Sequence, residues 1–143
     1  MSNRLKYLKE ASRSPKPTTQ YIDTKAAREM QLIFGFKNLD LDRKPFNCTP
    51  GEGESLLYTI KTLHHFSKMA RKQIDLGTDT CHPVPDDQIK KHNLFNFVLM
   101  SPSRKLHQLG RSRTPQRIVG YYESPNIFLF QVCLFDLKHH LSD

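Results

Sequence analysis

The sequence predicts an α+β fold in which N-terminal helices pack on one face of a C-terminal twisted antiparallel sheet. Apolar residues recur at helical spacing in the first half of the chain, and strongly β-forming runs fill its last third. With 143 residues, 37% of them hydrophobic, the chain can build one modest core. We therefore expect a flexible basic arm over residues 1–20 and a single α+β domain over residues 21–143.

The first predicted elements are two short helices. The arm contains a polar helix candidate from Arg4 to Ala11, followed by a Pro- and Ser-rich stretch that favours extended chain. After Asp23, a suitable N-cap, apolar residues at helical spacing predict a helix over residues 24–34. Gly35 suits its C-terminal cap.

A longer periodic pattern predicts a helix from Glu54 to Leu76 that stops at Gly77. Its apolar residues share one face and its basic residues another. The basic residues are Lys61, His65, Lys68 and Lys72. This stripe is either a solvated surface or a row of contacts for phosphates.

The second half of the chain predicts a sheet. Residues 77–88, rich in prolines and acids, predict a loop, and the apolar run over residues 93–100 predicts a strand. Two further strands are predicted over residues 117–122 and 126–136, with a tight turn between them. The polar stretch over residues 101–117 predicts a basic loop that joins two strands.

Composition narrows the class of protein. Twenty-two Lys and Arg against 14 Asp and Glu give a net charge of +8, which favours polyanions or an acidic partner. Three widely spaced cysteines indicate neither a disulfide framework nor a zinc knuckle, so a reducing cytoplasm is the simplest location. The sequence has no apolar run that would span a membrane and no signal-peptide core, so we expect a cytoplasmic protein without a membrane partner.

Positive charge is concentrated in the second half, because no Asp or Glu occurs between Gln88 and Tyr122. Cations that grip a backbone and aromatic faces that stack on bases are what a single-stranded nucleic acid requires. The candidate nucleic-acid contacts are Arg104, Lys105, Arg111, Arg113, Tyr121 and Tyr122, with Lys68 and Lys72 from the predicted helix. The alternative is a soluble basic linker beside core tyrosines.

The C-terminal strand ends in Asp136, Lys138, His139 and His140. Metal-independent RNA cleavage requires a proton acceptor, a proton donor and cations for the phosphate. In an antiparallel hairpin, Arg117 at the start of one strand lies at the same edge as these histidines. The predicted catalytic residues are therefore His139, Arg117, His140 and Asp136. Alternatively, the histidines are merely exposed, and Asp136 has a structural role.

Metal ligands are a further alternative, at His64 and His65, at Cys81 and His82, or at the C-terminal histidines. Adjacent histidines on a helix point about 100° apart, so they do not readily share one ion. The glycine-rich segment at residues 50–55 lacks the Lys-Ser/Thr of a P-loop. We therefore expect no metal site and no cofactor.

The C-terminal segment resembles one known superfamily. Arg117, Gly120, Asp136 and His139 form an Arg-x-x-Gly strand, a hairpin and an Asp-x-x-His ending, an arrangement similar to that of the RelE/ParE toxins. The resemblance covers about the last 50 residues. It implies a RelE-like sheet, an mRNA-cleaving activity that is often ribosome-dependent, and an antitoxin partner. It also implies proton transfer by His139, phosphate stabilisation by Arg117, and backbone contacts by Lys105 and Arg113.

These observations together predict a small RNA-acting protein, a metal-independent endoribonuclease of toxin type. One alternative is a non-enzymatic module that binds nucleic acid or the ribosome, for which binding weakens with salt while RNA stays intact. Another is a protein-interaction module whose basic loop meets an acidic partner.

Overall fold

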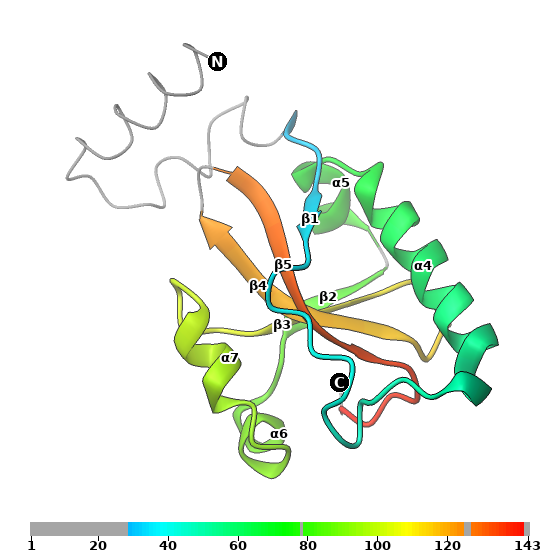
Figure 1. The fold of residues 1–143 in the computed structure, drawn as a ribbon. Helices are drawn as coiled ribbons and strands as arrows, with labels where there is room; N and C mark the ends of the chain where they lie inside the picture. Colours follow the sequence, from blue (N-terminus) through cyan, green and yellow to red (C-terminus); the bar gives the residue numbers. More distant parts are fainter. Residues whose placement is uncertain (1–28, 78, 125–126, 142–143) are drawn as a thin grey trace.

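The computed structural model describes residues 29–77, 79–124 and 127–141, which build a five-stranded mixed sheet (Figure 1). The strands are β1 (Ile33–Gly35), β2 (Thr80–Pro83), β3 (His107–Gly110), β4 (Arg117–Ser124) and β5 (Ile127–Asp136), in the order β1-β5-β4-β3-β2. The predicted α+β class is confirmed. The sheet is mixed rather than wholly antiparallel, because β1 joins β5 in parallel.

Helices cover both faces of this sheet, whereas the sequence pattern places them on one (Figure 1). The helices are the 3₁₀ turn η1 (Pro50–Glu52), α4 (Gly53–Ser67), α5 (Arg71–Leu76), α6 (Asp86–Lys91) and α7 (Phe95–Met100). Neighbouring residues of β4 point to opposite faces. Ile118 packs with α4 and α5 in one core cluster, and Val119 packs with α6 and α7 in the other.

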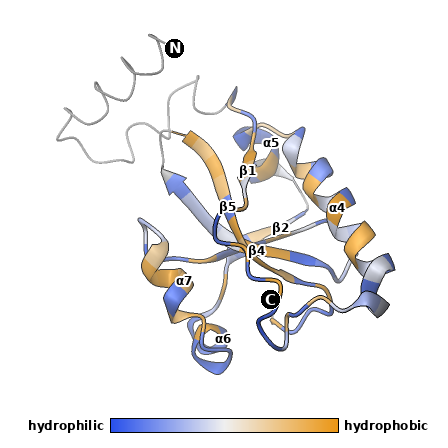
Figure 2. Ribbon diagram, in the orientation of Figure 1, coloured by the Kyte–Doolittle hydropathy of each residue, from blue (hydrophilic) through white to orange (hydrophobic). Residues whose placement is uncertain are grey.

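The β4–β5 hairpin is the centre of the molecule and confirms the two predicted C-terminal strands. β5 is apolar along most of its length, as Figure 2 shows, because it is covered on both faces. The register shifts by one residue at Gly120, so Cys133 has no direct partner on β4. A Cβ on Gly120 would collide with the backbone carbonyl of Gln131, which explains why glycine stands there.

From residue 30 onward, the helix predicted over residues 24–34 is replaced by extended chain. Residues 24–28 lie outside the described part of the chain, and residues 33–35 form β1. The side chain of Leu32 is 2% exposed, and its N–H donates to the carbonyl of Met69 at 3.0 Å. Pairing with β5 and with this neighbouring segment therefore overrides the local helical spacing.

The long helix predicted from Glu54 to Leu76 is broken into α4 and α5. Ala70 has extended backbone angles (φ −81°, ψ 161°) and forms a bridge with Gln31. The side chain of Gln73 accepts a hydrogen bond from the N–H of Ala70 at 2.8 Å and so starts α5. The break lets the chain before β1 pair with residues 69–71.

Three further predictions about residues 77–117 need correction. The strand predicted over residues 93–100 is instead helix α7 with its N-cap Leu94, and Leu94 and Phe97 are buried at helical spacing. A short apolar run does not distinguish a strand from a buried helix. The predicted loop over residues 77–88 contains β2 and the start of α6, and the predicted basic loop over residues 101–117 contains β3.

The predicted arm over residues 1–20, including its helix from Arg4 to Ala11, lies outside the described residues. Within the part of the chain that is described, no helix has the length and apolar character needed to cross a membrane.

Candidate functional site

Asp136, a predicted catalytic residue, is fully buried at the end of β5. Its Oδ1 accepts the N–H of His140 and its Oδ2 accepts the N–H of Leu141, both at 2.8 Å. The carboxylate thus closes the turn that follows the strand, which brings Leu141 into the core. This geometry supports a structural role for Asp136.

Arg117 faces Asp136 across the hairpin, as the antiparallel pairing predicts, but its side chain is enclosed. The residue is 6% exposed, and its guanidinium donates to the backbone carbonyls of Thr114 and Gln116. A guanidinium held this way does not present itself to a phosphate from solution.

The C-terminal histidines follow this buried pair. His140 is exposed and packs its ring edge-on against Phe46, with ring centroids 5.9 Å apart. His139 has a left-handed backbone (φ 56°) in the turn. Lys105 lies before β3, whereas the side chain of Arg117 lies against Gly110 at the end of β3. The structure therefore does not gather Arg117, His139 and Lys105 around one concavity.

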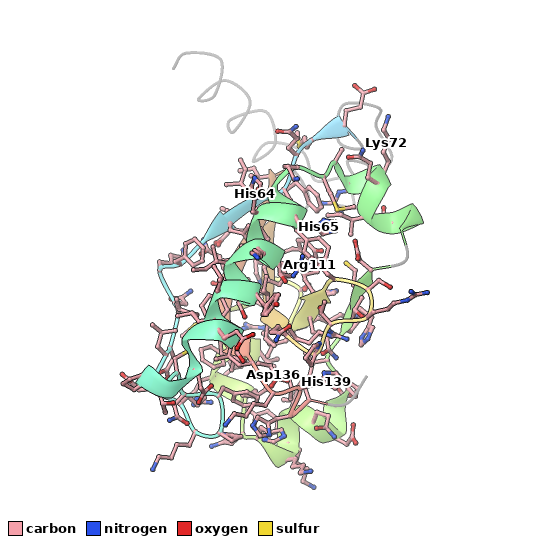
Figure 3. All side chains as sticks on the ribbon, turned by 90° about the vertical axis from the view of Figure 1, so that its right-hand side faces the viewer. His64, His65, Lys72, Arg111, Asp136 and His139 are labelled. Carbon is pink, nitrogen blue, oxygen red and sulfur yellow. The ribbon has the colours of Figure 1, made fainter. Side chains whose placement is uncertain are left out.

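The predicted nucleic-acid contacts fall into two groups at opposite ends of β3. Before the strand stand Arg104, whose guanidinium donates to the carbonyl of Leu99, and Lys105. Beyond the strand stand Arg111 and Arg113, and Arg111 lies on the side of the molecule that carries α4 and α5 (Figure 3). Lys68 is the C-cap of α4, and Lys72 belongs to α5.

The two predicted base-stacking tyrosines point into the protein. Tyr121 is 2% exposed, and its hydroxyl accepts a hydrogen bond from Asn38 at 2.8 Å. Tyr122 stacks on Phe128 with ring centroids 5.7 Å apart and contacts the thiol of Cys81. Burial raises the pKa of the Tyr122 hydroxyl well above its ordinary value, so this phenol stays protonated.

A histidine–aspartate pair forms where α4 passes the start of β2. His65 Nε2 lies 2.7 Å from Asp79 Oδ2. The two side chains are 37% and 14% exposed, so the imidazole reaches solvent while the carboxylate is largely covered. A carboxylate bound to one ring nitrogen fixes the orientation of a histidine and leaves its other nitrogen for proton transfer.

Asp79 is itself held in place from a third segment of the chain. Its Oδ1 accepts the N–H of Ser112 at 2.8 Å. Burial would raise the pKa of Asp79, but the hydrogen bonds from His65 and Ser112 and the nearby charge of Arg111 outweigh it and hold this pKa below its usual range. The carboxylate is therefore ionised at neutral pH and available to orient His65.

Cations flank this pair. Arg111 Nε donates to Thr62 Oγ1 at 3.2 Å, which fixes the arginine beside α4 (Figure 3). Lys61 and Lys68 occupy the same helical flank as His65 and are exposed. We call this region the α4 surface. It consists of Tyr58, Lys61, His65, Lys68, Asp79 and Arg111.

The sequence predicts four of the six residues of the α4 surface. The helical stripe of Lys61, His65 and Lys68 and the basic character of Arg111 are predicted, but Asp79 stands in a segment that predicts only a loop. No local spacing links Asp79 to His65, because the end of α4, a turn and α5 separate them. The pair appears only once the chain is folded.

A second histidine lies deeper in the sheet. His107 on β3 packs edge-on against Tyr122, with ring centroids 5.0 Å apart. Its Nδ1 is buried without a hydrogen-bond partner among the described residues. Burial, with the charges of Lys105 and His82, lowers the pKa of His107 to about 4. Such a histidine is neutral at physiological pH, and it is half-buried beside Tyr122.

Comparison with known proteins does not identify the chain: no family model, no curated protein and no solved structure matches it. In residues 29–77, 79–124 and 127–141, no three His, Cys, Asp or Glu side chains are grouped so that they could hold a metal ion.

Proposed function

We propose that this protein acts on RNA as a metal-independent endoribonuclease, and that His65 and Asp79 are its proton-transfer residues. The observation that carries the proposal is the 2.7 Å contact between a partly exposed imidazole and a largely covered, ionised carboxylate. Arg111 and two lysines lie beside it, where cations are needed to bind a phosphodiester. The proposal therefore places the active site on the α4 surface rather than at the C-terminal edge.

The chemistry uses groups that are on this surface. His65, with Nε2 bound to Asp79, takes the proton of an RNA 2′-hydroxyl on Nδ1, and the 2′-oxygen attacks the adjacent phosphorus. The bond from phosphorus to the 5′-oxygen breaks, and that oxygen takes a proton from water. Arg111 and Lys68 stabilise the extra negative charge that accumulates on the phosphate oxygens.

The test is an RNA-integrity assay with a chelator present, run with and without translating ribosomes. His65→Ala should reduce cleavage about 10²-fold to 10⁴-fold, the usual contribution of a general base. Asp79→Asn should lower the rate while leaving RNA affinity unchanged, because it acts through His65.

His64→Ala is the matched control, since His64 is the neighbouring residue, is exposed and lies outside the α4 surface. His139→Ala tests the C-terminal edge in the same assay. Cleavage that depends on His139 and not on His65 would contradict an active site on the α4 surface and would support one at the C-terminal edge of the sheet. Cleavage that the chelator abolishes would refute the mechanism.

The alternative is a non-enzymatic module that binds RNA or the ribosome through the same cations. It predicts intact RNA in every lane and affinity that falls with rising salt. Replacing Lys61 or Lys68 with Ala should then reduce the slope of log affinity against log salt by about 1 for each phosphate that the protein no longer neutralises.

The toxin-type assignment is proposed from the resemblance of the C-terminal segment to RelE/ParE toxins. A protein of this type would act in the cytoplasm and would be bound by an acidic antitoxin.

One observation favours a protein partner. The outward face of α7 exposes Phe95, Leu99 and Met100 to 50%, 64% and 47%, and Arg104 lies beside it. Apolar side chains next to cations suit an acidic amphipathic segment. Leu99→Glu should then weaken capture of such a partner without affecting RNA cleavage.

A further inference from the structure

We propose that Tyr58 is a base-stacking residue that makes the α4 surface select single-stranded over double-stranded RNA. This inference rests on the proposed RNA-acting function and names its substrate class. It assigns the aromatic contact to a residue other than the two tyrosines that the sequence indicates.

Tyr58 has the exposure and the neighbour that a stacking residue needs. It is 40% exposed on α4, and Lys61 Nζ lies 5.3 Å from the centroid of its ring. An aromatic face next to an ammonium group can bind a base and the phosphate attached to it. The ring is therefore already paired with the cation that would hold the backbone.

Tyr58 also lies in line with the proton-transfer pair. Tyr58, Lys61, His65 and Lys68 are separated by three, four and three residues, so they occupy one flank of α4. Seven residues of helix place the backbone of His65 about 10 Å along the axis from Tyr58, at 1.5 Å per residue. Glu54, one turn before Tyr58, gives this row an acidic end, so a polyanion is favoured from Tyr58 toward Lys68.

Two hydrogen bonds through Thr62 attach Arg111 to α4. Thr62 Oγ1 donates to the carbonyl of Tyr58 at 2.9 Å and accepts from Arg111 Nε at 3.2 Å. Arg111 is thus anchored in the turn that lies between Tyr58 and His65. Along the surface, the order is the ring of Tyr58, the guanidinium of Arg111 and the imidazole of His65. In the proposed complex, the ring stacks on a base, the guanidinium binds the phosphate and the imidazole meets the reacting 2′-hydroxyl.

The selection for single-stranded RNA follows from the fact that the faces of the bases are inaccessible in a duplex. In a duplex each base is stacked between its neighbours, so it offers no face to a protein side chain, whereas a base in a single strand can be turned out onto a ring. Lysine and arginine contacts to phosphates are available in both forms. Tyr58 is therefore the group on this surface that separates the two substrates.

The experiment measures binding of a fluorescent 2′-O-methyl oligouridine and of a duplex RNA of equal length, each at several salt concentrations. The methyl group removes the attacking hydroxyl, so binding is measured without cleavage. Tyr58→Ala should weaken single-strand binding about 10-fold, within the range measured for loss of one stacked base. The same substitution should leave duplex binding unchanged.

Tyr58→Phe keeps the ring and should retain single-strand affinity. Phe95→Ala is the matched control, because Phe95 is an aromatic residue 50% exposed on α7, on the other side of the sheet (Figure 1). Each variant should show the wild-type thermal midpoint, since both side chains are largely outside the core.

The outcomes separate this inference from the proposed function. If wild-type protein binds neither RNA, the proposed function fails and the inference fails with it. If it binds both RNAs equally and Tyr58→Ala changes nothing, RNA binding stands and stacking by Tyr58 is wrong. If Tyr58→Phe loses as much affinity as Tyr58→Ala, the hydroxyl is the contact and the stacking role is likewise overturned.

Discussion

At the scale of single residues, Asp136 explains why a strongly apolar strand ends in an acid. A strand that stops at the edge of a core leaves the following N–H groups without ladder partners, and buried N–H groups need acceptors. Both carboxylate oxygens of Asp136 supply them, at 2.8 Å each. The acid belongs to the turn that follows β5, and Lys138 pairs outward with Glu52 at 3.7 Å.

Asp136→Ala should lower the free energy of unfolding by about 2–3 kcal/mol, because it leaves two N–H groups without a charged acceptor. Urea denaturation measures this change. Lys138→Ala, at an exposed position in the same turn, should change stability by less than about 0.5 kcal/mol. RNA cleavage per folded molecule should be the same in both variants. Lost cleavage with unchanged stability would instead assign Asp136 to catalysis.

Gly120 is constrained by close approach of the backbone of β5. Gly120→Ala should destabilise the protein by about 3 kcal/mol or more, since the methyl group would meet the carbonyl of Gln131 at a register shift that cannot relax freely. Gly53→Ala is the control, because nothing lies within 4 Å of a Cβ there. That change should be neutral or should stabilise the first turn of α4 by about 0.5–1 kcal/mol. Equal midpoints for the two variants in thermal denaturation would contradict this account.

At the scale of elements, the sequence predicts those whose pattern is long and dense. β4 and β5 carry continuous β-branched and aromatic runs, so their strands and their antiparallel pairing are predicted correctly. The six-residue helices α6 and α7 are not predicted correctly, because a helix of fewer than two turns shows too little periodicity in its apolar residues. β1 is missed for another reason: its three residues are held extended by β5, a partner that the local sequence does not reveal.

Helix α4 is attached to the sheet by a narrow buried face. Thr59, Thr62 and Phe66 are fully buried, whereas Ile60, one of the apolar residues at helical spacing in the predicted helix, is 54% exposed. The apolar pattern therefore predicts the helix but assigns part of its buried face incorrectly. The two threonines direct their hydroxyls to carbonyls of the preceding turn and so can be buried beside apolar residues.

Phe66→Ala should cost about 3–5 kcal/mol, because it leaves a cavity between α4 and the sheet. Leu57→Ala on the outer face of the same helix, where Leu57 is 50% exposed, should cost less than about 1 kcal/mol. Denaturant titration of both variants checks the pair. A similar loss for the two would mean that α4 is not held by this face.

At the scale of the whole molecule, the candidate site depends on segments that are distant in sequence. The sequence predicts the basic residues of the α4 surface, because charge is visible in composition. It does not predict that Ser112 and His65 converge on Asp79, or that Arg117 is enclosed, because both depend on how β3 and β4 are placed against α4. Which side chains are accessible is a property of the packed sheet rather than of any one segment.

The neutral His107 makes global stability depend on pH. The unfolded chain takes up a proton on this histidine near pH 6.5, whereas the folded protein does so only near pH 4. The unfolded state therefore binds more protons in between, and the free energy of unfolding falls as pH drops from 6.5 toward 4. The total contribution is on the order of 2–3 kcal/mol.

His107→Phe keeps the ring contact with Tyr122 but cannot take up a proton. The difference in free energy of unfolding between this variant and the wild type should be small at pH 7 and should grow in favour of the variant as the pH falls to 4. Urea denaturation across this range measures it. Parallel curves for the two proteins would show that His107 does not carry the dependence.

The pairing of β1 with β5 also determines the order in which the protein can be completed during its synthesis. Ile33 lies beside Leu129, so nearly a hundred residues must be made after the first strand before its partner exists. At a ribosomal rate of about 5–20 residues per second, roughly 5–20 s pass between synthesis of β1 and synthesis of its partner β5. During this time the apolar residues of β1 have no strand to pair with. Conditions that slow translation of the second half of the chain should therefore favour aggregation of the nascent protein, and a chaperone that shields the first fifty residues should suppress it.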